Sequence, residues 1–230
     1  MRVSAAQIRA LFPRLTAAQV ARVLLQTRFN EVRNRIYTGF RRQLGLGPGR
    51  LVLLPTDELT AVAPPVIFGT FHVGPTLALG APMERLPGEV LVLRRRSYKP
   101  AQAKNVSTAE TEGSEERRAQ AFHRAVMHLR AGGYTLVPID PLEASRVPAP
   151  FFGRSLLLAR GAFALARVAR VPIVPLIARW RGVHVELFRG PRIEPSDSEN
   201  AMAAEAARWL EQYLKDAPGE VTSRVFELMV

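Results

Sequence analysis

The stretch VIFGTFHVGPTL, residues 66–77, gives the clearest indication of how this chain folds. Its first six residues are apolar or small, a composition typical of a strand buried inside a sheet. His72 follows at once, and Gly74-Pro75 then predicts a tight turn into a short helix over residues 75–81. The stretch therefore predicts a buried strand that holds a histidine at the edge of a sheet.

The rest of the chain continues this alternation of short apolar runs and helical patterns. Strand–helix–strand alternation builds parallel sheets, so the sequence predicts an α/β fold: a single domain with a largely parallel mixed sheet flanked by helices. Residues 99–113 and the proline-rich segment before residue 151 are expected to be loops. The expected strands are 51–54, 66–71, 90–93, 134–139, 173–177 and 183–187, and the expected helices are 16–43, 75–81, 114–131, 158–169 and 197–215.

Three polar residues come directly after expected strands. They are His72, Arg94 and Asp140. Ligands of open α/β sheets bind beyond the carboxyl ends of the strands, so we expect these side chains to lie on one edge of the sheet. The sequence does not say in which order the strands are arranged.

The charge of the chain is concentrated at its start. Residues 1–50 contain ten arginines and one acid, Glu31, whereas the whole chain of 230 residues has a net charge of +12. We divide the chain into a basic amphipathic helical segment, 1–45, and an α/β domain, 46–230. Ser4 and Thr16 are expected to cap the helices of the N-terminal segment, and Thr16 together with Gln19 is expected to form a capping box. Such a segment suits an anionic partner, although it is equally consistent with a solvated helix face.

The sequence also limits the location and the chemistry. No uninterrupted apolar run is long enough to cross a bilayer, and the start does not resemble a signal peptide, so we expect a cytoplasmic location. The chain has no cysteine, which excludes disulfides and thiolate metal sites. His123 and His128 lie about 140° apart on one expected helix, and His184 alternates within a strand, so we expect surface or packing roles for the first two, a structural role for His184, and no metal site.

Several short blocks occur in a characteristic order. They are HVGP at 72–75, Arg94 after its strand, Gly132-Gly133 leading into VPID at 137–140, FFGR at 151–154, and VPIVP at 171–175. This succession resembles the lysophospholipid acyltransferase superfamily, and most closely its lipid A lauroyl/myristoyl acyltransferase branch, over roughly residues 15–225. No single block is very specific, and the resemblance depends on their order and spacing.

The resemblance implies transfer of a fatty acyl group from an acyl carrier protein or a CoA thioester to a hydroxyl of a lipid or glycolipid. The thioester is a co-substrate, and no other cofactor is implied. His72 matches the general base, Asp140 a recurring aspartate, and Arg94 an arginine that binds phosphate or stabilises charge. The matching substrate-binding residues are Gly74, Phe152, Gly153 and Arg154. Members of the branch usually carry an N-terminal membrane helix; without one, we expect peripheral contact with the anionic inner face of the cytoplasmic membrane.

One position departs from the family pattern. The family has a carboxylate five residues after the histidine, and this chain has Leu77. A carboxylate orients the histidine and stabilises the imidazolium, and loss of the equivalent partner in a serine-protease triad lowers the rate about 10⁴-fold. Asp140 is the best replacement, because it is expected on the same edge. Glu110 and Glu112 on the polar loop are further candidates, and Glu84 is a poor one.

Two other functions remain open at this stage. The chain could be a catalytically impaired homologue that binds acyl chains or lipids as a scaffold or subunit. A nucleic-acid-binding protein ranks last, because the arginines are not interleaved with aromatic residues and no nucleic-acid motif occurs. The sequence leaves the acyl chain length, the acceptor, the donor and the oligomeric state undetermined.

Overall fold

The strand predicted from residues 66–71 lies in the middle of the main sheet. In the computed structural model, which describes residues 2–44, 57–94, 104–141, 145–182 and 184–230, it is β1 (Val66–Thr70), and all five of its residues are buried. β1 pairs in parallel with β4 (Tyr134–Pro138) on one side and with β7 (Ile173–Arg181) on the other. Its apolar composition therefore reflects a strand covered on both faces.

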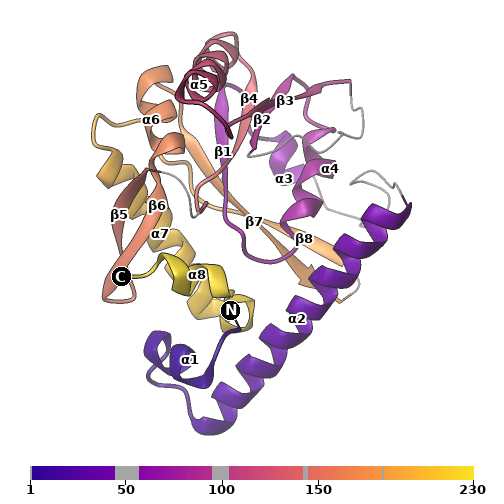
Figure 1. Ribbon diagram of the computed structural model, residues 1–230, viewed down its shortest axis with the longest axis vertical. Helices are drawn as coiled ribbons and strands as arrows, with labels where there is room; N and C mark the ends of the chain where they lie inside the picture. The colour runs from indigo at the N-terminus through magenta and orange to yellow at the C-terminus, as the bar shows by residue number, and fades with distance from the viewer. Residues whose placement is uncertain (1, 45–56, 95–103, 142–144, 183) are drawn as a thin grey trace.

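The described residues form a six-stranded sheet in the order β3-β2-β4-β1-β7-β8 (Figure 1). β2 (Val90–Arg94) pairs in parallel with β3 (Val106–Glu110) and with β4. β8 (His184–Arg189) is antiparallel to β7. The prediction of an α/β chain with a mostly parallel mixed sheet is confirmed.

Helices cover both faces of this sheet. On one face, α5 (Glu115–Arg130), α6 (Arg160–Ala169) and α7 (Glu199–Asp216) contribute to a core that includes Ile67 of β1. On the other, α3 (Asp57–Thr60), the 3₁₀ helix η1 (Thr76–Leu79) and α4 (Gly80–Met83) contribute to a core that includes Phe68. Neighbouring residues of one strand point to opposite cores, because successive side chains of a β-strand alternate between the two faces of the sheet.

The expected loop over residues 99–113 contains a strand, so that prediction was wrong for β3. Its sequence VSTAE lacks an apolar run because β3 forms the edge of the sheet and is largely half-buried. An edge strand has little apolar surface to cover, and periodicity alone does not reveal it. The expected strand at 51–54 lies outside the described residues.

The proline-rich segment before residue 151 is also a strand rather than a loop. β5 (Arg146–Phe151) and β6 (Arg154–Ala159) form an antiparallel hairpin that pairs with no other described strand. Pro148 and Pro150 are exposed and alternate with buried residues. Proline is tolerated at the edge of a sheet, where its missing N–H breaks no ladder.

The N-terminal helices pack on the domain. Ser4 caps α1 (Ala5–Leu11) in a capping box, and Thr16 and Gln19 form a second one at the start of α2 (Ala17–Leu44), so both caps are confirmed. Ile8, Leu11 and Val20 belong to the same core as α7. Among the described residues, no helix combines the length and the apolar character that crossing a membrane requires.

A buried polar contact joins α2 to the end of the chain. The 3₁₀ helix η2 (Pro218–Glu220) places Glu220 under α2, where Asn30 Nδ2 donates to its Oε1 over 3.2 Å and to the Gly219 carbonyl over 3.2 Å. Burial raises the pKa of the Glu220 carboxyl, and the nearby Arg179, Asn30 and Arg33 offset this in part. By contrast, Glu186 accepts hydrogen bonds from Arg179, which lower its pKa.

These opposite shifts predict opposite effects of pH on folding. A raised pKa in the folded state means that Glu220 favours folding most in acid, below the ordinary carboxyl pKa, and that this contribution is lost as the pH rises through the raised value. We expect Glu220→Gln to remove that decline. We expect Glu186→Gln, the matched control, to remove stability that is fully present above the ordinary carboxyl pKa and is lost as the pH falls through the lowered value. Urea unfolding from about pH 3 to pH 8 measures both, and parallel profiles for the three proteins would contradict the prediction.

Candidate active site

The register of β1 and β4 places His72 opposite Asp140. Thr70 of β1 is paired with Pro138 of β4, and the Ile139 N–H donates to the Thr70 carbonyl over 2.9 Å, which continues the parallel ladder beyond the strands. Two residues further on, each chain reaches the carboxyl edge of the sheet. The predicted meeting of these two residues at one edge is confirmed.

Asp140 binds His72 through both of its oxygens. Oδ1 lies 2.5 Å from His72 Nδ1, and Oδ2 accepts the backbone N–H of His72 over 2.6 Å. The carboxylate therefore holds the ring and the main chain of the same residue at once. Two short, charge-assisted contacts of this kind fix the position and the rotation of the imidazole.

The chemistry of this pair selects one tautomer of the neutral histidine. An ionised carboxylate has no proton to donate, so Nδ1 carries the hydrogen and Nε2 presents its lone pair. The side chain of Asp140 is 4% exposed and that of His72 is 40% exposed. The carboxylate is thus shielded from water while the ring remains accessible, which is the arrangement that a general base requires.

The turn after His72 depends on Gly74. Its φ of +69° lies in the region that favours glycine, and a Cβ at this position would lie 1.9 Å from the Ala178 carbonyl oxygen of β7. The backbone therefore passes directly over β7. No side chain fits here, which gives the glycine of the HVGP block a physical reason.

Leu77, the residue at the family's carboxylate position, lies in η1. Its side chain is outside the described part of the structure. The carboxylate that bonds the His72 ring is Asp140, from a segment 68 residues later in the chain. Asp140 was the first of the replacements that the sequence suggested.

Arg94 lies at the same edge but not beside His72. It ends β2, and β4 separates β2 from β1 in the sheet, so Arg94 is two strand positions away, about 10 Å. Its register partner on β3 is Glu110. Burial lowers the pKa of the Arg94 guanidinium, and the charge of Glu110 partly offsets the effect. A cation held in this way suits an anionic group that spans the edge of the sheet.

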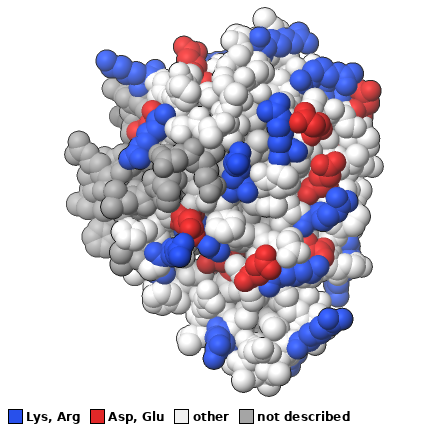
Figure 2. Space-filling view, turned by 180° about the vertical axis from the view of Figure 1, so that it is seen from behind, with Lys and Arg blue, Asp and Glu red and all other residues white. Residues whose placement is uncertain are grey.

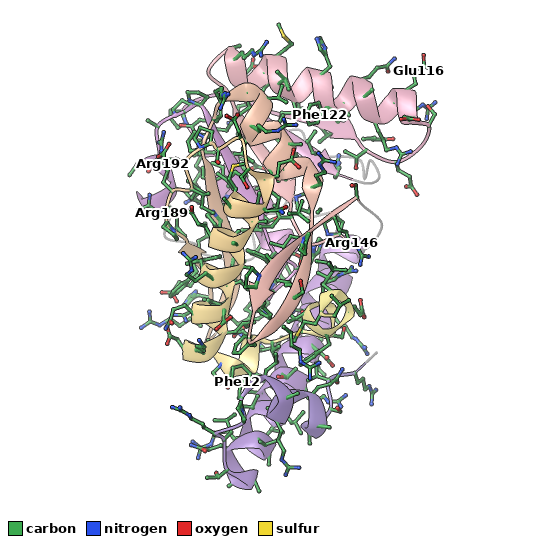
Figure 3. All side chains as sticks on the ribbon, turned by 90° about the vertical axis from the view of Figure 1, so that its left-hand side faces the viewer. Phe12, Glu116, Phe122, Arg146, Arg189 and Arg192 are labelled. Carbon is green, nitrogen blue, oxygen red and sulfur yellow. The ribbon has the colours of Figure 1, made fainter. Side chains whose placement is uncertain are left out.

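The structure places Phe152, Gly153 and Arg154 elsewhere. Phe152 and Gly153 form the turn of the β5–β6 hairpin, with φ values of +47° and +71°, as in the two-residue turns that suit hairpins. The Phe152 N–H donates to Glu211 of α7 over 2.6 Å, and its ring packs edge-on against Phe12. Figure 3 shows Phe12 just below the turn, at the end of the hairpin away from Arg146.

The opposite end of the hairpin approaches the site. The Ala159 N–H donates to the Ile139 carbonyl over 2.9 Å, next to Asp140. Residues 153 and 159 are six strand residues apart, about 20 Å. The structure therefore does not bring the FFGR block to the edge that carries His72, and its contact with an acceptor stays a prediction.

Sequence reasoning missed one contact at this site. Thr222, just before α8 (Ser223–Leu228), donates its hydroxyl to the His72 carbonyl over 3.4 Å. The two residues are 150 positions apart, and no local pattern around Thr222 could have revealed the contact. It ties the C-terminal segment to the histidine backbone.

The remaining histidines lie on other elements, His123 and His128 on α5 and His184 on β8. His128 Nε2 lies 3.0 Å from the Tyr134 carbonyl oxygen and 3.2 Å from that of Glu89, so its role is structural, as expected. His123 is exposed on α5, and His184 is exposed at the start of β8. A comparison with family models and with curated proteins finds no match for this chain.

Substitution of Gly74 tests how strongly the site depends on its turn. We expect Gly74→Ala to destabilise the protein by more than about 3 kcal/mol, because the backbone cost of a positive φ is added to a collision with β7. Gly132 has a φ of +84° and open space where a Cβ would point, so Gly132→Ala is a matched control that should cost only about 1 kcal/mol. Urea unfolding measures both, and equal losses would show that the contact with β7 is unimportant.

Proposed function

We propose that this protein is an acyltransferase that moves a fatty acyl group from a thioester to the hydroxyl of a lipid or glycolipid, with His72 as general base. The observation that carries the proposal is the contact of 2.5 Å between His72 Nδ1 and Asp140. It supplies the base–carboxylate pair that the resemblance to the lysophospholipid acyltransferases requires. In this proposal Asp140 supplies the carboxylate that the family has five residues after the histidine, where this chain has Leu77.

The first step is attack by the acceptor hydroxyl. Nε2 of His72 takes the hydroxyl proton while the oxygen forms a bond to the carbonyl carbon of the thioester. The ring becomes an imidazolium, and the buried Asp140 carboxylate stabilises that charge through Nδ1–H. The two hydrogen bonds to Asp140 keep the ring in place, so little reorientation is needed as the proton moves.

The second step breaks the carbon–sulfur bond. The tetrahedral intermediate collapses, the sulfur leaves, and the imidazolium returns its proton to the departing thiolate. The products are an ester and the free thiol of the acyl carrier protein or CoA, and His72 regains its starting tautomer. Every proton and electron pair in the two steps is therefore accounted for by the substrates and His72.

The remaining residues have binding roles in this proposal. Arg94 holds a phosphate of the donor or the acceptor at the sheet edge, and Gly74 lets the backbone turn beside the reacting atoms. Phe152, Gly153 and Arg154 contact the acceptor only if it extends along the hairpin. The basic, amphipathic N-terminal helices attract an acidic carrier protein or an anionic membrane, which places the enzyme at the inner face of the cytoplasmic membrane.

The alternative is a homologue that binds acyl chains without turnover. That hypothesis arose from Leu77, since a lone histidine would lack its orienting partner. The contact between His72 and Asp140 removes this reason and favours the enzyme.

Replacement of the two paired residues tests the proposal. We expect His72→Ala to abolish acyl transfer, and Asp140→Asn to lower the rate by about 10⁴, because an amide that donates to Nδ1 stabilises the wrong tautomer. The assay combines the purified chain with acyl carrier protein or CoA thioesters and with lysophospholipid, glycolipid or water as acceptor. It measures the released thiol together with the acylated product.

The control is His123→Ala, which removes an exposed histidine from α5 and should leave the rate unchanged. Circular dichroism and urea unfolding establish that each variant is folded. Transfer that survives His72→Ala would overturn the mechanism. Acyl binding without transfer to any acceptor would favour the non-enzymatic alternative.

A further inference from the structure

One side of α2 exposes a row of large apolar side chains. Leu25 is 72% exposed, Phe29 59%, Val32 52% and Ile36 54%. Steps of four, three and four residues place them on one side of a helix. The row is about 16 Å long at 1.5 Å per residue. Isolated apolar residues on a surface are ordinary, but a continuous row of four marks an interaction surface.

The opposite side of the same helix is already occupied. Val20, Val23 and Tyr37 are buried in the two cores, and Thr27 and Asn30 are buried against η2. The exposed row is therefore not part of the core of this chain. α2 crosses the outside of the molecule, with its full length visible in Figure 1.

Arginines flank the apolar row on both sides. At 100° per residue, Arg22 and Arg33 lie on one side of it and Arg28 and Arg35 on the other. Arg22 and Arg35 are exposed, whereas Arg28 donates to the Val3 carbonyl over 3.1 Å and the Arg33 guanidinium lies 4.4 Å from the centre of the Trp180 ring and 5.3 Å from that of Phe29. A hollow beside the row is lined by Arg2, Arg28, Arg35, Glu31 and Val32, which gives three positive charges against one negative charge.

The rest of this end of the molecule is also basic. Arg9 and Arg14 add to the arginines already named, and residues 2–30 contain no acid. Figure 2 shows blue side chains at the lower end of the back face, the end that α1 and the first turns of α2 occupy in Figure 1. Arginines therefore flank the apolar row and continue beyond its N-terminal end.

We infer that this face of α2 lies in the surface of an anionic bilayer, with the row of Leu25, Phe29, Val32 and Ile36 among the acyl chains and the flanking arginines at the phosphates. An amphipathic helix with a basic rim binds lipid in this way, because long arginine side chains reach the head groups while the apolar side is buried. The inference deepens the proposed function and rests on it for the membrane-borne acceptor.

The charge pattern favours a bilayer over a second copy of the chain. Two such faces packed together would bring arginine rows against each other, and Glu31 alone cannot neutralise them. An acidic carrier protein would match the arginines but gives no reason for four exposed apolar side chains. A bilayer matches both features.

Docking through this face would set the position of His72. Thr27 and Asn30, on the inner side of α2, hydrogen-bond the Gly219 carbonyl, and Thr222 of the same segment hydrogen-bonds the His72 carbonyl. A bilayer on the outer side is then about one helix diameter, about 10 Å, from the segment that supports the histidine. The attachment is direct enough to hold the site near the membrane.

Vesicle sedimentation of the full chain tests the inference. The probes are vesicles of phosphatidylcholine alone and vesicles of phosphatidylcholine and phosphatidylglycerol in equal amounts. We expect the wild type to sediment with the anionic vesicles only. The double variant Phe29→Glu/Val32→Glu and the double variant Arg22→Glu/Arg35→Glu, which reverses two exposed charges, should each lower the partition coefficient by about tenfold or more.

A matched control changes exposed apolar residues on other helices. Met127→Glu/Val168→Glu alters α5 and α6, where these side chains are 50% and 40% exposed, and should partition as the wild type does. An equal loss in this control, or normal binding by Phe29→Glu/Val32→Glu, would overturn the inference. So would equal binding to neutral vesicles, or a wild-type dimer that Phe29→Glu/Val32→Glu converts to a monomer.

Acyl transfer separates this inference from the proposed function. Phe29→Glu/Val32→Glu should keep transfer to a detergent-dispersed acceptor and lose it with an acceptor held in vesicles. His72→Ala should lose both activities and still bind anionic vesicles. Vesicle binding without any transfer would support the inference about α2 and overturn only the proposed function.

Discussion

The candidate site exists because β1 and β4 pair in parallel and in one register. This register puts residue 72 opposite residue 140 where both chains leave the sheet. The carboxylate can then bond the ring and the backbone N–H of one histidine, over 2.5 and 2.6 Å. A slip of one residue would turn one of the two side chains to the other face and separate the pair. The buried composition of β1, with a core on each side, makes such a slip costly.

The site is assembled from segments that are distant in the chain. β1 leads to His72, β4 leads to Asp140, and β7 supports the turn through the close approach of Gly74 to Ala178. The C-terminal segment adds the contact from Thr222, and through Gly219 and Glu220 it also holds α2. The histidine and the outer helix are thus joined through one segment. A surface that binds α2 would in this way be placed close to the proposed chemistry.

A motif describes neighbours in the chain, whereas a catalytic pair needs only neighbours in space. The family pattern expects a carboxylate five residues after the histidine, and Leu77 breaks it. Parallel strands offer a second route, because every strand that ends at this edge can deliver a side chain to it. Arg94 shows the limit of the same argument: β4 lies between β2 and β1, so a shared edge does not mean contact with His72. The FFGR block does not share the edge at all, because the β5–β6 hairpin holds it at a distance from His72.

Local sequence patterns were sufficient to predict the α/β class, the central strand, the caps at Ser4 and Thr16, and the candidacy of Asp140, because apolar periodicity and capping chemistry act over a few residues. They did not reveal β3 or the β5–β6 hairpin, whose edge positions leave weak apolar patterns. The strand order, the pairing of His72 with Asp140, and the side of α2 that faces outward became known only from the folded chain. Those outcomes depend on contacts between residues far apart in the sequence, which no local pattern encodes.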